Sequence, residues 1–218
     1  MKLPDIRSVK NWLEEGYKRN PGPWVEHSEL VANAAQIIAN KIDILNDNKA
    51  YIMGLIHDIG RINGIVQERH TIDGYNFLKA KGYEKLGRIC ITHCFPNKNI
   101  RANIGKWDCN ENELEFIKTF LGNYEYDDYD RLIQLCDCIS MGDKYVLIEK
   151  RLIDVTLRYN LKNQVSLGIP LLEKWKRYLE IKDYFTSIIG KSIYNLLPNV
   201  VENTFGSTNS YSPKLNWS

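Results

Sequence analysis

The 218-residue sequence lacks any continuous run of about 18 apolar residues, the length needed to cross a membrane as a helix. Its first segment, MKLPDIRSVKNWLEEGYKRN, is amphipathic and carries acidic residues, unlike the apolar centre of a secretory signal. The five cysteines are an odd number, and without an export signal they favour reduced thiols over a disulfide framework. These features predict a cytoplasmic protein that does not associate with membranes.

A strong charge of either sign is also missing. The 29 lysines and arginines nearly balance 27 aspartates and glutamates, so the formal net charge is only +2. A chain this close to neutral has no overall electrostatic attraction for a nucleic-acid polymer. We therefore expect any anionic ligand to be a small molecule that is held by a local site.

No alternating apolar pattern is long enough to predict a substantial sheet, and apolar residues instead recur at steps of three and four. This spacing predicts an all-α protein with helices near 5–19, 24–41, 48–58, 71–81, 83–94, 111–121, 126–141, 144–160, 170–187 and 190–197. Residues 95–110 are expected to form a loop, and the polar stretch 202–218 a loosely attached tail. We predict a core domain at 1–160 and a helical extension at 161–218 that packs on it.

Histidine is scarce, and each of its four occurrences stands at an informative place. His27 belongs to the apolar face of the predicted helix 24–41, and His57 ends the apolar run AYIMGLI. His70 opens the segment HTIDGYNFL, and His93 closes LGRICITHC. A single histidine on an apolar face is more often a hydrogen-bonded core residue than a ligand, so no one of these carries an argument alone.

Two aspartates complete the pattern. Asp58 follows His57 directly, and Asp137 interrupts the apolar segment RLIQLCDCISM. A carboxylate at such a place is unfavourable unless a positive charge compensates it. Neutral imidazole and carboxylate are common ligands of Fe, Mn, Zn, Co and Ni ions. The order H…HD…H…H…D therefore predicts a transition-metal site at which several helices converge.

The cysteines offer a competing metal site. Cys90 and Cys94 are four residues apart, and Cys136 and Cys138 are two apart, which resembles the ligand pairs of structural zinc sites. Because all four fall in predicted helices, we interpret them as core or pocket-wall residues, with the latter two pointing away from Asp137.

Two further alternatives are weaker. A nucleophile formed by His93 and Cys94 is not expected, since adjacent residues of a helix point in different directions. The acidic and aromatic segment NYEYDDYD, residues 123–130, is interpreted as a solvated turn with a helix-capping aspartate rather than a cation site.

The histidines and aspartates resemble the signature of the HD superfamily of metal-dependent phosphohydrolases, a histidine, an HD pair and a distant aspartate on antiparallel helices. The resemblance covers about residues 24–145 and implies an HD-domain-like antiparallel helical bundle with extra C-terminal helices. It implies one metal held by His27, His57, Asp58 and Asp137. It also implies a second metal, since His70 and His93 resemble the extra pair of the two-metal members, in which Asp58 would bridge the ions.

Details of the motifs separate this chain from known branches of that superfamily. HDIGR, DGYN and the pair His93-Cys94 only partly match the HDIGK, GYP and paired-histidine signatures of the cyclic-di-GMP phosphodiesterases. The bacterial 5′-nucleotidase branch carries a catalytic glutamate three residues after the HD aspartate, and Arg61 stands at that place here. The nearest overall pattern is the two-metal branch that includes symmetrical diadenosine tetraphosphate hydrolases.

The resemblance implies a metal-dependent phosphohydrolase that cleaves a small phosphoester or nucleotide through a metal-bound hydroxide. Two ions about 3.5–4 Å apart can share that hydroxide and clamp a phosphoryl group. We assign catalytic roles to Asp58 and Arg61, since a guanidinium suits phosphate oxygens, although Arg61 could equally be a solvated arginine. The loop after His93 could cover an anionic substrate with its basic residues Lys98, Arg101 and Lys106.

Two other functions stay open. A related di-iron branch acts as an oxygenase, and metal identity together with oxygen consumption would distinguish it. A non-catalytic sensor of a metal or nucleotide is the other, although it would have little need for six metal-binding side chains. A homodimer is compatible with the sequence.

Overall fold

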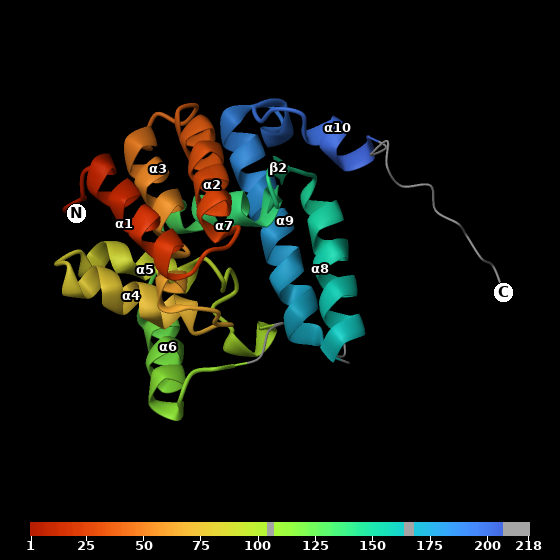
Figure 1. Cartoon of the computed structure of the whole chain (residues 1–218). Helices are drawn as coiled ribbons and strands as arrows, with labels where there is room; N and C mark the ends of the chain where they lie inside the picture. The colour runs from red at the N-terminus through yellow and green to blue at the C-terminus, as the bar shows by residue number, and fades with distance from the viewer. Residues whose placement is uncertain (104–106, 164–167, 207–218) are drawn as a thin grey trace.

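The computed structural model describes residues 1–103, 107–163 and 168–206. The described chain is mainly helical, with a single two-stranded hairpin, which confirms the predicted all-α class (Figure 1). Its α-helices are α1 (Ile6–Arg19), α2 (Trp24–Ala39), α3 (Asp47–Ile56), α4 (His70–Ala80), α5 (Glu84–Thr92), α6 (Glu111–Asn123), α7 (Asp128–Ile139), α8 (Ile148–Asn163), α9 (Ile169–Ile189) and α10 (Val200–Phe205). The remaining elements are three 3-10 helices and one hairpin: η1 (Ile59–Asn63), η2 (Ile100–Ala102), η3 (Ile193–Asn195), β1 (Ser140–Met141) and β2 (Lys144–Tyr145).

The predicted helices at 126–141 and 144–160 differ from the structure at the point where they meet. Helix α7 ends at Ile139, because β1 and β2 pair in antiparallel register there. Gly142 supplies the turn with a φ of 63°, a left-handed conformation that glycine adopts without steric cost. Helix α8 therefore begins only at Ile148.

The last predicted elements were also partly wrong. A helix at 190–197 is not formed, since Gly190 ends α9 in a left-handed conformation and only the short η3 follows. Helix α10 occupies 200–205, part of which was expected to be tail. Residues 207–218 of that tail lie outside the described residues. The predicted boundary near residue 160 falls inside α8, and the division into two domains remains a prediction.

Two glycines allow helices to approach closely around the centre of the fold. Helix α2 packs along α3, and a Cβ atom on Gly54 would collide with the backbone of Ala32. A Cβ atom on Gly60 would collide with the backbone of His70 and Gly74, where α4 crosses η1. The glycine of the HDIG segment therefore brings the start of α4 against Asp58.

A buried polar network joins α5 to α7. Arg88 of α5 donates hydrogen bonds to Asp127 and Asp130, both at 2.8 Å, and contacts the hydroxyl of Tyr124. Asp130 is fully buried and also accepts a hydrogen bond from Thr92 Oγ1 at 2.8 Å. Asp127 caps α7, as expected for 123–130, but Asp130 is a core residue rather than part of a solvated turn.

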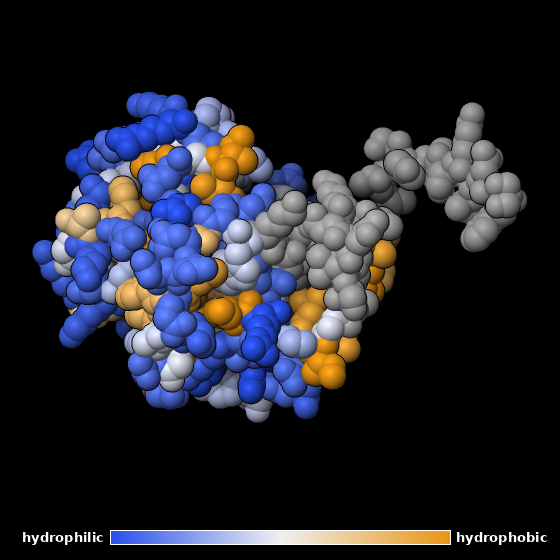
Figure 2. Space-filling model, turned by 90° about the horizontal axis from the view of Figure 1, so that it is seen from below, coloured by the Kyte–Doolittle hydropathy of each residue, from blue (hydrophilic) through white to orange (hydrophobic). Residues whose placement is uncertain are grey.

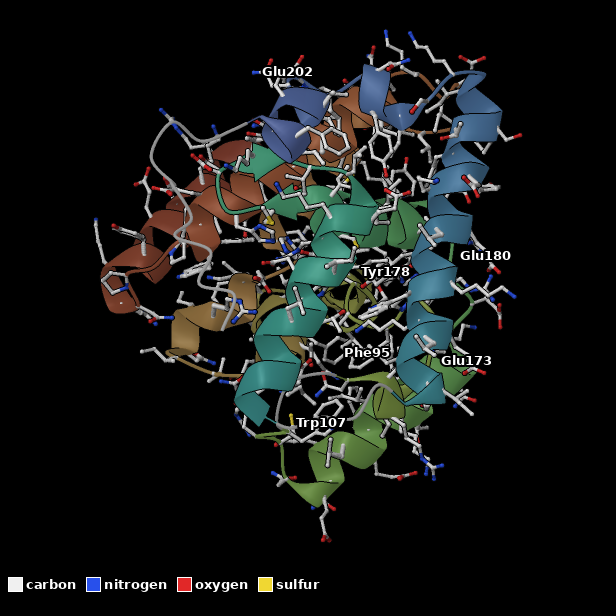
Figure 3. The ribbon with its side chains drawn as sticks, turned by 90° about the vertical axis from the view of Figure 1, so that its right-hand side faces the viewer. Phe95, Trp107, Glu173, Tyr178, Glu180 and Glu202 are labelled. Carbon is white, nitrogen blue, oxygen red and sulfur yellow. The ribbon has the colours of Figure 1, made fainter. Side chains whose placement is uncertain are left out.

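Helices α8 and α9 cover one side of the molecule (Figures 1 and 3). In Figure 3, Tyr178 of α9 points inward toward Phe95, whereas Glu173 and Glu180 lie on the outer side. Phe95 stacks on Trp107 with ring centroids 6.0 Å apart. The C-terminal helices thus close the fold over the loop that follows α5.

The face in Figure 2 is mostly hydrophilic, with apolar side chains gathered toward the side that carries α8 and α9. Apolar residues that these two helices expose include Ile153, Leu157, Ile169 and Leu172. They provide apolar surface for a second copy, and the homodimer remains a prediction. Within the described part of the chain, no helix is both long enough and apolar enough to cross a membrane.

Candidate metal centre

The six residues proposed as ligands come from separate elements and meet at the middle of the fold. His27 lies in the first turn of α2, and Asp137 in the last turn of α7. The other four lie at ends of helices: His57 after α3, Asp58 before η1, His70 at the start of α4 and His93 after α5. Helix ends suit a metal site, because the terminal backbone N–H and C=O groups have no partner within the helix and can hydrogen-bond a ligand side chain.

Backbone carbonyls set the tautomer of three of the histidines. His57 Nδ1–H donates to Gly54 O at 2.7 Å. His70 Nδ1–H donates to Gln67 O at 2.5 Å, and His93 Nδ1–H donates to Ile89 O at 3.1 Å. Each Nε2 atom is consequently left with a lone pair for another partner.

Asp58 lies between two groups of histidines. Its Oδ1 atom is 3.3 Å from His70 Nε2 and 3.7 Å from His93 Nε2. Its Oδ2 atom is 3.9 Å from His57 Nε2. The two oxygens of one carboxylate therefore face different imidazoles, as a bridging ligand would require.

The other carboxylate belongs to the His27 and His57 side of the centre. Asp137 Oδ1 lies 2.9 Å from His27 Nε2 and 4.0 Å from His57 Nε2. These two side chains are the more accessible ones, with 17% of His27 and 24% of Asp137 exposed. His57 is fully buried behind them.

Burial and neighbouring charges set the protonation of the site. Burial lowers the pKa of His57 and His70 and lowers the pKa of His93 to about 4. For Asp58, burial opposes ionisation, but the Arg61 guanidinium and the histidines hold the pKa well below its usual range. Burial also opposes ionisation of Asp137, but the hydrogen bond from His27 and the neighbouring imidazoles of His27, His57 and His93 together hold its pKa below the usual value. Neutral imidazoles and ionised carboxylates are the forms that bind metal ions.

Two buried atoms of the centre have no hydrogen-bond partner among the described residues, His57 Nε2 and Asp58 Oδ1. An orphaned buried acceptor costs on the order of 1–3 kcal/mol, and more when it is charged. Divalent cations bound at the centre would provide a partner for each of these atoms. Groups of three residues near enough to share one ion are His27, His57 and Asp58, then His57, His93 and Asp137, and finally His70, His93 and Cys94. The residues present therefore fit a metal ion.

Arg61 does not point freely into the pocket. Its Nε atom donates to Asp58 Oδ2 at 2.6 Å, and Nη1 donates to Val66 O at 3.4 Å. The guanidinium thus orients the carboxylate that the histidines surround. Its predicted contact with phosphate remains a prediction.

A pocket of about 660 Å³ opens on the centre. Five of the six proposed ligands line it, all except His57, and Trp24, Arg61 and Glu68 lie beside them. This volume suits a small organic ligand. The pocket therefore has both the metal-binding groups and the space for a substrate.

The sequence did not assign Arg151 to this pocket, whereas it predicted Cys94 as a core or pocket-wall residue. Arg151, which falls in the predicted helix 144–160, reaches the pocket from α8 and is 22% exposed. Cys94 lies with its Sγ atom 3.1 Å from His93 Nε2 and 3.6 Å from His70 Nε2. The expectation that His93 and Cys94 diverge was wrong, because α5 ends at Thr92 and both residues lie beyond it. Pro96 was the available signal, since a helix ends ahead of a proline.

Lys98 and Arg101, two of the three basic residues expected to cover a substrate, lie away from this pocket. Lys98 pairs with Glu125 at 3.2 Å and lines a separate pocket together with Arg177. Arg101 is exposed at the surface, and Lys106 lies outside the described residues.

Comparison with known protein families gives one match. The HD domain family model matches residues 24–142, which run from the start of α2 to the turn after β1. The match is longer than half of the chain and contains all six proposed ligands. No curated protein and no solved structure matches the chain.

Proposed function

This chain belongs to the HD-domain family of metal-dependent hydrolases, and we propose that it is a phosphohydrolase acting on a small phosphoester or nucleotide. The observation that carries the proposal is the buried Asp58 carboxylate surrounded by imidazole Nε2 atoms, with its Oδ1 atom lacking any hydrogen-bond partner among the described residues. A carboxylate in this state calls for a cation. The adjoining pocket provides the space for an anionic substrate.

Two groups of residues would hold two divalent transition-metal ions. His27, His57 and Asp137 would form one group, and His70 and His93 the other, with Asp58 between them. When bound, such ions supply an activated water and neutralise charge on a phosphoryl group. Nitrogen-rich ligation favours Fe, Mn, Zn, Co or Ni over magnesium alone.

The protein's own side chains orient both the ligands and the substrate. Carbonyl acceptors hold the three buried imidazoles in one tautomer, so no rearrangement is needed when an ion enters. Arg61 holds Asp58 in place through a short hydrogen bond. Arg151 lies at the edge of the pocket, where its guanidinium can bind phosphate oxygens in bidentate fashion.

The test combines metal analysis with a substrate screen. The purified protein is analysed for metal by mass spectrometry and then assayed on nucleotides, dinucleoside polyphosphates and sugar phosphates with added Mn²⁺, Co²⁺ or Ni²⁺. We expect hydrolysis of at least one class, and loss of more than about 100-fold in His57→Ala and Asp58→Ala, because even the loss of a residue that only supports a ligand lowers metal affinity 10- to 100-fold.

Asp183→Asn is the matched control, since Asp183 is an exposed carboxylate on α9 and should leave metal content and activity unchanged. Full activity in His57→Ala, or activity that survives complete removal of metal, contradicts the proposal. Oxygen consumption by an iron-loaded protein that cleaves no phosphoester would favour the oxygenase alternative instead.

A further inference from the structure

Cys94 brings a sulfur atom into one half of the centre. Its half-buried thiol lies within 3.6 Å of the Nε2 atoms of both His70 and His93. We propose that Cys94 is a thiolate ligand at this half, so that the ion between His70 and His93 is bound by nitrogen and sulfur together. The proposal rests on the metal-binding part of the proposed function.

Two of the three distances among the nitrogen and sulfur atoms match the edges of a tetrahedral metal site, and the third is shorter. Typical metal bonds of about 2.0–2.1 Å to nitrogen and about 2.3 Å to sulfur place two nitrogens about 3.3 Å apart, and nitrogen and sulfur about 3.6 Å apart. The structure has 3.3 Å between His70 Nε2 and His93 Nε2. Cys94 Sγ is 3.6 Å from the first nitrogen and 3.1 Å from the second. Asp58 Oδ1 lies beside the same two nitrogens, at 3.3 Å from His70 Nε2 and 3.7 Å from His93 Nε2.

The hydrogen bonding of the histidines independently indicates a cation at this place. Because the Nδ1–H groups of His70 and His93 donate to carbonyls, both Nε2 atoms carry lone pairs, and these atoms are only 3.3 Å apart. The buried Asp58 Oδ1 atom beside them has no hydrogen-bond partner among the described residues. Three electron-rich atoms around one point are unfavourable without a positive charge between them.

Cys94 differs from the other cysteines near the centre. The thiol of Cys90 is fully buried, donates to Ile56 O at 3.3 Å and packs against Gly74, so it belongs to the core. Cys94 instead lines the pocket. On binding, its thiol would release its proton to solvent and leave a thiolate.

A thiolate would make the two halves of the centre chemically unequal. Sulfur ligation favours zinc, cobalt and ferrous iron over manganese and magnesium. The half formed by His27, His57 and Asp137 has only nitrogen and oxygen atoms and would accept harder ions. We therefore expect two sites of different metal preference.

The experiment is a Co²⁺ titration of chelator-treated protein, followed by absorption spectroscopy. A Co²⁺–thiolate pair absorbs in the near ultraviolet by charge transfer, whereas nitrogen and oxygen ligands give only the weaker visible bands. We expect the charge-transfer band in the wild-type protein and in Cys109→Ser, a matched control in which another half-buried thiol is removed. Cys94→Ser should lose the band, retain the visible bands of the other half, and bind Zn²⁺ at least about 10-fold more weakly.

Zinc-edge X-ray absorption of the wild-type protein tests whether sulfur binds the ion even if Cys94→Ser does not fold, since it detects a sulfur neighbour of zinc directly. Cobalt binding without charge-transfer absorption, or zinc without a sulfur neighbour, overturns the role of Cys94 and leaves the metal centre intact. Absence of any metal binding by the wild-type protein overturns both this inference and the proposed function.

Discussion

Replacement of Arg88 by alanine should destabilise the protein by about 3 kcal/mol at pH 8. Asp130 is fully buried, and Arg88 is the only cation that the structure shows hydrogen-bonded to it within the described residues. Removal of one partner from a buried ion pair costs about 3–5 kcal/mol, because it leaves an uncompensated charge. Burial already raises the pKa of Asp130, so the variant can relieve part of this cost by taking up a proton. We therefore expect a value at the lower end of the range.

The assay is urea unfolding at pH 8 and pH 5, together with thermal unfolding. For a chain of this length, about 3 kcal/mol corresponds to a fall in Tm of about 6–12 °C. In the variant, Asp130 has a folded-state pKa above its unfolded value, so the folded state binds more protons and loses stability as the pH rises. The difference between variant and wild type should consequently be smaller at pH 5 than at pH 8.

Arg131→Ala is the matched control. Arg131 pairs with Asp128 on the surface of α7 at 3.1 Å and is 38% exposed, so its loss should change stability by less than about 1 kcal/mol. Equal, small effects of Arg88→Ala and Arg131→Ala would refute the reasoning. The same network sets how α5 docks on α7, so Arg88→Ala should also weaken metal binding.

Three further predictions follow from the packing and the pocket. Gly60→Ala should destabilise the protein by about 1–3 kcal/mol in urea unfolding and weaken metal binding, because the added methyl group pushes His70 away. Its control, Gly122→Ala, meets no atom within 4 Å inside α6 and should be neutral or stabilising by up to about 1 kcal/mol. Arg151→Gln should raise KM for a phosphorylated substrate by about 10-fold with its metal content unchanged, whereas Arg177→Gln, in a separate pocket, should leave KM as it is. Removal of metal by a chelator should lower Tm, and added Mn²⁺ or Zn²⁺ should restore it in proportion to the logarithm of its concentration.

The sequence by itself determined the helical class and most helix positions, since these depend on local signals. Apolar residues at steps of three and four mark the buried faces, and the glycines and prolines between them mark the ends. It also singled out the six candidate ligands, because ionisable residues at the end of AYIMGLI and within RLIQLCDCISM are unfavourable in a core unless something compensates them. The family match over residues 24–142 confirms the family that these residues resemble, and the ligand roles remain a prediction.

Only the tertiary structure decided what surrounds those ligands. Because the β1–β2 hairpin lies between α7 and α8, helix α8 begins later than the sequence predicts. Arg151 of α8, more than ten residues after Asp137 in the chain, lines the same pocket as Asp137. Cys94 approaches His70 through a contact between two helix ends that periodicity does not encode. Arg61 binds Asp58, three residues before it, instead of pointing freely into the pocket. Local pattern specifies which faces are buried, whereas the partner of a polar side chain depends on which helix ends meet in space.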